Sequence, residues 1–376
     1  MLNDLVAPDW EPIGDAEATD VLAHYLDGAA LARRAAPLWR SPRPMSAAAL
    51  VTLPDRTVFI KRHHVRVRSR ERLELEHAFA RHVRARGVET PAILTTTEGS
   101  SVLERGDYRY EVQEAAAGAD LYRDVPSWQP FRQRRHAEAA GAALARFHAV
   151  AADFDVEPWA FDVLCDSTAI TLATDPADAY HRLVTTRPGL GRATAPYDVV
   201  GDFEAILRQP IAYAADRCGG VATQWTHGDW HGSNLTWRDH GEQASVVSVL
   251  DLGLSNRTFA LHDLAVAIER SVIDWLDTAG VGFITVDYDA LGALLRGYAS
   301  VRALNGQDLT TLSAVLPVAH VEFALSEVEY FGAVVHSRAN VDLAYRSYLL
   351  GHVQWFESQG GAALLARLRT GADLGT

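Results

Sequence analysis

The stretch 227–256 constrains the fold of this chain more than any other part of its sequence. It begins with His227, Asp229 and Asn234 in the spacing His-x-Asp-x-x-x-x-Asn, and Asp251 follows an apolar run near its end. Two short runs of strand type, with a polar turn between them, separate Asn234 from Asp251. A hairpin brings its two ends together, so Asn234 and Asp251 are predicted to lie at the same end of it.

These side chains are of the types that phosphoryl transfer needs. The transferred group carries its charge on three equatorial oxygens, so a protein mainly has to hold Mg²⁺ and align an attacking hydroxyl group. Asn234 offers an amide oxygen and Asp251 a carboxylate oxygen, which are hard ligands that Mg²⁺ accepts. We therefore predict that Asn234 and Asp251 bind Mg²⁺ and that Asp229 positions or deprotonates the acceptor hydroxyl.

Composition narrows the class of partner. The chain has 376 residues, enough for two lobes with a substantial core, and a net charge of −13. Nucleic acids and anionic membranes attract clustered Lys and Arg, so neither is expected as the main partner. A cationic or neutral small substrate fits this charge better.

Cysteine and histidine usage points to no metal centre of the zinc type. Cys165 and Cys218 lie outside any metal-ligand or thiol motif, and the histidines show no zinc spacing. We expect two reduced thiols and a cytoplasmic protein. No signal peptide is expected at Met1, and no apolar run is expected to approach the length that spans a bilayer.

The hydrophobic pattern predicts a small mixed lobe followed by a mainly helical one, with an N-terminal helix before both. The expected segments are an N-terminal helical cap over 1–39, a lobe for the nucleotide phosphates over 40–114, and a helical lobe with the catalytic loop over 115–376. Within them we expect helices at 16–36, 70–86, 131–150, 177–183 and 202–218, strands at 49–53, 57–61, 92–94, 101–104, 108–113, 235–237 and 246–250, and a loop at 185–196.

Lys61 ends a predicted strand, the position from which a lysine reaches nucleotide phosphates. Its expected ion-pair partner is a carboxylate of the next helix. Glu76 is favoured by its spacing to the helix end, while Glu74 remains possible and Glu71 is a weaker third choice.

Residues 113–118 form an Ala-rich segment between the lobes, where Gln113 and Ala115 would contact the nucleotide. An ordinary linker is the alternative reading. Residues 42–50 contain no glycine, so a glycine-rich phosphate cover is absent and no phosphate ligand can be named there.

Together these motifs resemble the aminoglycoside phosphotransferase and choline kinase branch of the protein-kinase-like fold, over about residues 40–275. The resemblance implies an α+β, bilobal architecture. It also implies that Asp229 is the catalytic base or orients the hydroxyl group, that Lys61 binds the phosphates of ATP, and that Asp263 supports a catalytic loop in which His227 is structural. The C-terminal part is most similar to homoserine-kinase-like and stress-response-kinase-like members.

The function that the resemblance implies is ATP- and Mg²⁺-dependent transfer of a phosphoryl group to a hydroxyl of a small molecule. Aminoglycosides, amino sugars, homoserine and amino alcohols are the candidate acceptors. An atypical Ser/Thr protein kinase is the alternative, although the short path from Asp251 to Asp263 lacks an Ala-Pro-Glu motif. A nucleotide-binding pseudokinase comes third, because Lys61, Asp229, Asn234 and Asp251 are all present.

Two glutamates are candidates for acceptor binding. Glu322 and Glu329 are one heptad apart and share a helix face, whereas Glu327 lies about 140° from Glu329. If this acidic face lines the cleft below Asp229, it selects an amine-bearing acceptor. A solvated helix face is the alternative.

Overall fold

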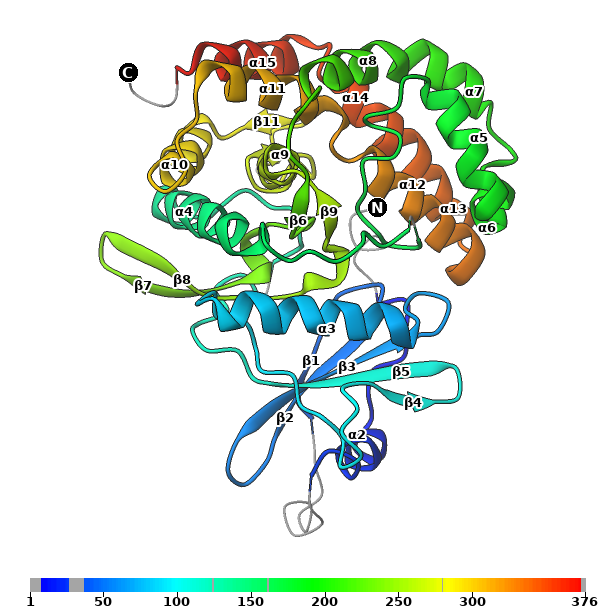
Figure 1. Cartoon of the computed structure of the whole chain (residues 1–376), viewed down its shortest axis with the longest axis vertical. Coiled ribbons are helices and arrows are strands. Elements are labelled where there is room, and N and C mark those ends of the chain that lie inside the picture. The colour runs from blue at the N-terminus through cyan, green and yellow to red at the C-terminus, as the bar shows by residue number, and fades with distance from the viewer. Residues whose placement is uncertain (1–7, 27–36, 124, 161, 279, 373–376) are drawn as a thin grey trace. The chain divides into compact units, whose positions relative to one another are not determined.

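The computed structural model divides the chain into two units and describes residues 8–26, 37–123, 125–160, 162–278 and 280–372. Unit 1 comprises Met1–Gly118 with Ser248–Leu250, and unit 2 comprises Ala119–Val247 with Asp251–Thr376. Unit 1 contains a small antiparallel sheet, and unit 2 is mainly helical (Figure 1). The predicted α+β, bilobal fold class is confirmed.

The sheet of unit 1 has the strand order β1-β2-β3-β5-β4. The two predicted hairpins are present in it, with three strands longer than predicted and the strand predicted at 101–104 shorter. The edge strand β1 was not predicted, because it is short and begins with a proline, which a sheet accepts only at its edge. The strands are β1 (Pro37–Arg40), β2 (Ala47–Thr52), β3 (Thr57–His64), β4 (Leu103–Arg105) and β5 (Tyr108–Glu114).

The N-terminal helix α2 (Asp15–Leu22) packs into the core of this sheet. Its described part is shorter than the predicted helix 16–36, of which residues 27–36 lie outside the described residues. Glu17 of α2 accepts hydrogen bonds from Arg62 at 2.6 Å and from the Tyr110 hydroxyl at 2.8 Å. These bonds attach the N-terminal segment to β3 and β5.

Helix α3 (Arg70–Ala85) follows the prediction closely. Ser69 caps its first turn, and Gly87, with φ at +92°, ends it in the left-handed conformation that favours glycine. A buried carboxylate joins this helix to the sheet: Glu111 of β5 bonds to His77 of α3 at 2.8 Å and to His63 of β3 at 3.1 Å. Burial alone raises the pKa of Glu111, but the two histidines outweigh burial and hold it well below its usual range.

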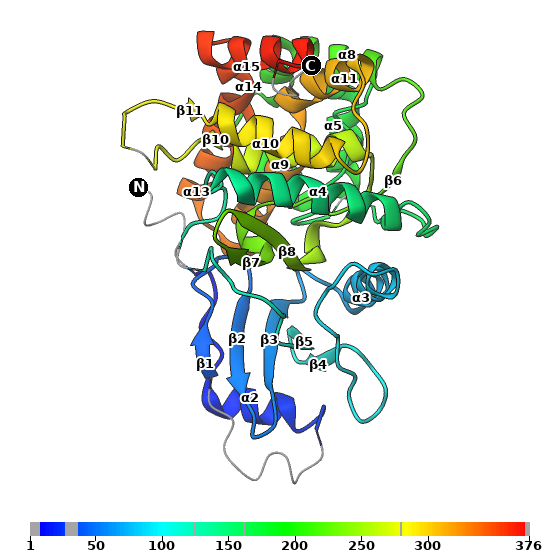
Figure 2. The ribbon, with the colours of Figure 1, turned by 90° about the vertical axis from the view of Figure 1, so that its left-hand side faces the viewer.

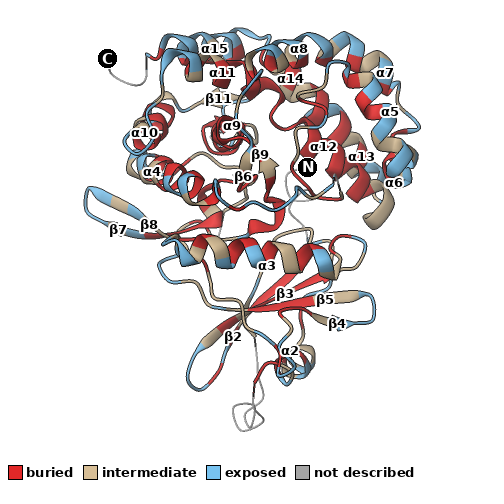
Figure 3. Cartoon of the chain, viewed as in Figure 1, coloured by how far each residue is buried: buried red, intermediate tan, exposed pale blue. Residues whose placement is uncertain are grey.

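The helices of unit 2 surround one central helix. All residues of α9 (Ala260–Ser271) are buried, and Figure 3 shows this helix, viewed end-on, in the colour of buried residues. The others are α4 (Arg134–Ala151), α5 (Pro176–Thr186), α6 (Pro188–Thr194), α7 (Val199–Asp202), α8 (Arg208–Arg217), α10 (Tyr288–Ala299), α11 (Gly306–Val315), α12 (Val321–Glu329), α13 (Arg338–Asp342), α14 (Gly351–Trp355) and α15 (Gln359–Thr370).

The prediction of a loop at 185–196 is wrong, because α6 occupies most of this range. A composition rich in Gly, Pro and Arg predicts a loop here, but Pro188 is the first residue of α6, where its missing N–H costs nothing. The predicted helix 202–218 is present, with a π-helical turn at Phe203–Leu207 before α8.

The stretch Gly306–Val335 corrects another expectation. Its 30 residues are long and apolar enough to cross a membrane by length and composition. However, 94% of its most apolar window is buried inside the protein, as in a core helix.

Two glycines allow α4 and α10 to pack closely (Figure 2). A Cβ atom on Gly141 would meet the carbonyl oxygen of Leu294 at 2.0 Å, and one on Gly297 would meet that of Glu138 at 2.0 Å. Both contacts are with backbone atoms, which cannot rotate away.

We predict that Gly141→Ala destabilises the protein by about 1–3 kcal/mol through overpacking, although alanine normally stabilises a helix interior. Gly306→Ala is the matched control, because a Cβ at this helical position meets nothing within 4 Å. Chemical denaturation of both variants measures the difference. Equal stability of the two would contradict the close packing of α4 against α10.

Candidate functional site

The motif residues of unit 2 lie on a loop held between short strands. Strand β6 (Gln224–Thr226) pairs antiparallel with β9 (Asn256–Thr258), and the loop leaves β6 at His227. It ends at Asn234, where β7 (Leu235–His240) begins. Strand β8 (Gln243–Val249) returns after a two-residue turn and leads to Asp251. The hairpin predicted between Asn234 and Asp251 is therefore present.

Asp263 fixes the start of this loop. Its carboxylate, fully buried on α9, accepts hydrogen bonds from the backbone N–H groups of His227 at 2.8 Å and Gly228 at 2.9 Å. His148 of α4 bonds to the same carboxylate at 2.9 Å. Burial raises the pKa of Asp263, but His148 and the loop outweigh it, so the pKa is lowered and the group stays ionised.

The loop needs its glycine and its histidine. Gly228 has φ at +76°, and a Cβ there would meet the carbonyl oxygen of Leu254 at 2.7 Å. The Nδ1 atom of His227 accepts the backbone N–H of Asp229 at 3.1 Å, which turns the chain toward Asp229. His227 is fully buried, in agreement with a structural role.

The structure brings Asp229 and Asn234 together. The side-chain amide of Asn234 donates to the carboxylate of Asp229 and to its backbone carbonyl, both at 2.9 Å. The amide nitrogen of Asn234 is thus bonded within the loop, and the amide oxygen of Asn234 is the atom that can bind another ligand. His231 lies 3.4 Å from the second carboxylate oxygen of Asp229.

Asp251 has an exposed side chain and a left-handed backbone, with φ at 53° and ψ at 73°. A non-glycine residue rarely adopts this conformation, and such positions cluster at functional sites. The strain is consistent with a carboxylate whose direction is set by its function.

The nucleotide candidates lie in unit 1. Lys61 is on β3, in register with Glu111 of β5. Glu76 of α3 is buried and lies 4.0 Å from Arg68, and Glu74 pairs with Arg70 at 2.8 Å. The predicted ion pair between Lys61 and Glu76 stays a prediction.

The expectation that Ala115 contacts the nucleotide stays a prediction, but its backbone N–H is already used. Its backbone N–H donates to the carbonyl of Thr57 at 3.0 Å, so it cannot also serve an adenine ring. The side-chain amide of Gln113 donates to Glu111 at 2.9 Å. Contacts from this segment to a nucleotide would have to come from other backbone groups.

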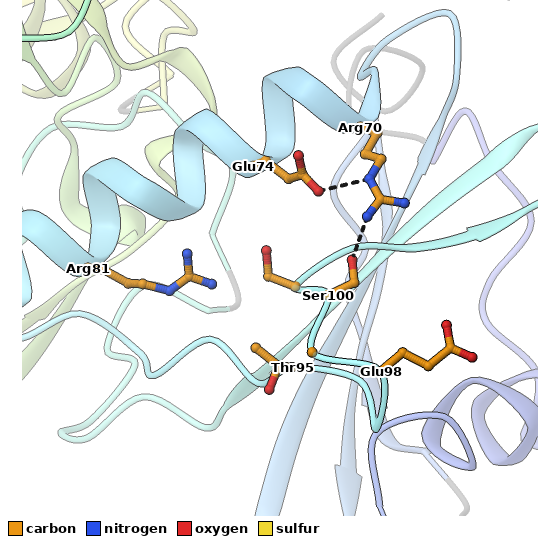
Figure 4. Close-up of a pocket in the computed structure, with 8 residues that line it drawn as sticks. Arg70, Glu74, Arg81, Thr95, Glu98 and Ser100 are labelled. Atoms are coloured by element: carbon orange, nitrogen blue, oxygen red, sulfur yellow. Dashed lines mark hydrogen bonds and ion pairs between the residues drawn. The ribbon is translucent and has the colours of Figure 1, made fainter.

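An open polar groove of unit 1 lies between α3 and the loop after Ala92 (Figure 4). Arg70 bonds there to Glu74 and to the hydroxyl of Ser100. None of the predicted catalytic or metal-binding residues lines this groove, so we assign it no part of the chemistry. Its lining residues are Arg70, Glu74, Arg81, Thr95, Glu98, Gly99, Ser100 and Ser101.

Sequence reasoning missed Arg270, which forms an ion pair with Asp229. This arginine is on α9, its side chain is 2% exposed, and its guanidinium lies over the rings of Trp128 and Phe323 at 5.1 and 4.7 Å. The signal in the sequence was Glu269-Arg270, a charged pair inside an otherwise apolar helix.

The expected acidic face of Glu322 and Glu329 is wrong. Both side chains are buried and have partners within the protein. Glu322 accepts the backbone N–H groups of Ile170 and Thr171, each at 2.7 Å. Glu329 accepts two hydrogen bonds from Arg187, at 2.9 and 2.7 Å. These carboxylates connect helix α12 to distant segments and are not open to an acceptor.

The model of a family described as "Phosphotransferase enzyme family" matches residues 46–304, more than half of the chain. A search of proteins with curated descriptions finds no match.

Several solved structures share the fold. One is a microcompartment-associated aminopropanol kinase, with a TM-score of 0.60, 17% identity and coverage of 95% of this chain and 98% of the other. A spectinomycin phosphotransferase bound to ADP and spectinomycin has a TM-score of 0.53 at 11% identity, covering 95% and 98%. An ethanolamine kinase of Plasmodium vivax has a TM-score of 0.53 and 11% identity, with coverage of 90% of this chain and 89% of the other. At these identities the likeness is one of fold.

The structural role of Glu322 gives a prediction. Glu322→Ala should lower the free energy of unfolding by about 1–3 kcal/mol, because the N–H groups of Ile170 and Thr171 lose their acceptor while buried. Glu204→Ala is the control: Glu204 is exposed and, among the described residues, its ion pair is with its helical neighbour Arg208, so its change should stay within about 0.5 kcal/mol. Chemical denaturation measures both. If Glu322→Ala leaves the stability unchanged, the structural role is contradicted and Glu322 is again a candidate for binding the acceptor.

Proposed function

The chain belongs to the phosphotransferase enzyme family, and we propose that it transfers the γ-phosphoryl group of ATP, with Mg²⁺, to a hydroxyl group of a small molecule. The observation that carries this proposal is the contact of Asp229 with Asn234 on a loop fixed by Asp263. It gives the protein one oriented carboxylate for a hydroxyl group beside one amide oxygen suited to a metal ion.

Asp229 acts on the acceptor. The amide of Asn234 holds one of its carboxylate oxygens, and Arg270 and His231 lie beside the other. A carboxylate fixed in this way can accept the proton of an alcohol and hold its oxygen in line with the phosphorus atom. Because orientation is set by the loop, little reorganisation is needed when the acceptor binds.

Asn234 and Asp251 are the residues that would hold Mg²⁺. The donor set fits the ion, since one neutral amide oxygen and one carboxylate leave room for phosphate oxygens and water. The bound metal would neutralise charge on the transferred phosphoryl group. We assign the phosphates themselves to Lys61, as the sequence pattern predicts.

The path from Asp251 to α9 supports a small acceptor over a peptide. Residues 252–260 are buried, apart from the half-buried Arg257, and contain β9, which pairs with β6. A protein kinase uses the corresponding region as an extended segment that docks its substrate. A buried, strand-paired segment offers no such surface.

A panel experiment tests the proposal. Amino alcohols, hydroxy amino acids, hydroxy acids, amino sugars and aminoglycosides are incubated with the protein, ATP and Mg²⁺, and ADP release and the phosphorylated product are measured. We expect at least one acceptor to give Mg²⁺-dependent product. ADP release without any phosphorylated acceptor would make the protein an ATP hydrolase and contradict the proposal.

We predict that Asp229→Asn keeps nucleotide affinity and lowers kcat by about 10²–10⁴-fold, because it loses the proton acceptor while keeping the shape of the side chain. Turnover and titration with ATP measure the two effects. Asp155→Asn is the control, since its carboxylate is 95% exposed and stands outside the loop. Near-native turnover of Asp229→Asn would remove this residue from the mechanism.

A further inference from the structure

Arg270 is a buried cation in contact with the proposed catalytic carboxylate, and the proposed function gives it no contact with the acceptor. We infer that Arg270 binds a carboxylate group of the acceptor, so that the substrate class is a short hydroxy acid, including hydroxy amino acids. This inference rests on the proposed function, because it names the acceptor of the same site.

The position of Arg270 is fixed by its surroundings. Trp128 and Phe323 lie against its guanidinium, and the ring of Tyr348 lies 5.1 Å from that of Trp128. Trp128 has φ at 64°, an uncommon conformation for a bulky residue that costs about 1–3 kcal/mol. The protein therefore accepts backbone strain in the segment that covers this arginine.

Arg270 has hydrogen-bonding capacity that the protein leaves unused. A guanidinium group carries five N–H donors, in a planar fork that matches a carboxylate. Among the described residues, its ion pairs are with Asp229 and with Glu269, whose carboxylate lies 3.8 Å from Nε. Nε is buried and has no hydrogen-bond partner within the part of the chain that the structure describes. A buried charged donor without an acceptor is costly, so a ligand that supplies one gains affinity.

Glu269 does not neutralise Arg270 at close range. Its carboxyl group is hydrogen-bonded to Nδ1 of His352 at 3.0 Å. Burial raises the pKa of Glu269 to about 7, so its negative charge is partly suppressed near neutral pH. Tyr348, in the same surroundings, has a buried hydroxyl that no described residue hydrogen-bonds. The site thus combines a guanidinium donor with a neutral hydroxyl donor.

A cationic acceptor fits these residues less well. Aromatic faces attract ammonium groups, but here the faces of Trp128 and Phe323 already carry the guanidinium of Arg270. The carboxylates expected to attract an amine, Glu322 and Glu329, are occupied within the protein. Nε of Arg270 and the hydroxyl of Tyr348 are instead donors that suit an anionic group of the acceptor.

The contact between Arg270 and Asp229 also limits the length of the acceptor. If Asp229 holds the hydroxyl and Arg270 holds the carboxylate, the two groups must be only a few bonds apart in one molecule. This condition selects short hydroxy acids and excludes large neutral sugars.

Matched pairs of compounds that differ by a carboxylate test the inference. The pairs are L-serine and ethanolamine, L-homoserine and aminopropanol, and glycolate and methanol. Thermal unfolding with Mg²⁺ and ADP reports binding, and kcat/KM reports turnover. We expect at least one carboxylate compound to raise the Tm and, where turnover occurs, to exceed its partner by about 10- to 100-fold in kcat/KM, the worth of a charged hydrogen bond.

Variants then assign the effect to Arg270. In Arg270→Gln the advantage of the carboxylate compound should disappear, and in Arg270→Lys it should be partly kept, because lysine keeps the charge without the fork. Arg208→Gln removes an exposed arginine and should keep the full advantage. If Arg270→Gln does not fold, the inference is tested by the preference of the native protein for carboxylate compounds and by the result for Arg270→Lys.

The outcomes separate this inference from the proposed function. Carboxylate-dependent stabilisation that requires Arg270, without phosphorylation of any compound, supports the binding site and counts against the kinase reaction. Phosphorylation of amino alcohols as well as or better than their carboxylate partners supports the reaction and overturns the inference. No stabilisation by any carboxylate compound, or an unchanged preference in Arg270→Gln, overturns it too.

Discussion

The loop that carries Asp229 and Asn234 depends on one buried carboxylate. Asp263 is fully buried, yet it is ionised, because His148 and two backbone N–H groups of the loop satisfy it. Burying an unpaired carboxylate would be prohibitive, so the loop and the carboxylate are each stable only with the other. The turn at Gly228 then points the chain so that Asp229 reaches Asn234. The geometry of this loop therefore depends on a buried carboxylate of α9.

Helix α9 combines stability and function. Its apolar residues make it the central helix of unit 2, while its charged residues stand at its two ends, Asp263 under the loop and Arg270 beside Asp229. A buried helix holds such groups rigidly, which is what positioning a small acceptor requires. The carboxylates of Glu322 and Glu329 on α12 have a different role, since they bind partners within the protein.

The sequence predicted what depends on local spacing. Asp229 and Asn234 belong to one loop, so their contact could be expected from their order alone. Contacts between distant segments could not be predicted in this way: Arg270 meets Asp229 only because α9 packs under the loop. Helical periodicity placed Glu322 and Glu329 on one face but could not show that Thr171 and Arg187 would occupy them. The helix α6 was missed because proline acts differently at a first turn than inside a helix.

The stereochemical course of the reaction tests the central claim, that Asp229 presents the acceptor hydroxyl directly to ATP. The measurement uses ATP made chiral at its γ-phosphorus with oxygen isotopes, and the best acceptor. A single in-line displacement inverts the configuration at phosphorus, and the account predicts inversion. Retention would show that a group of the protein is phosphorylated first, and it would contradict the assignment of Asp229 as the residue that aligns the acceptor.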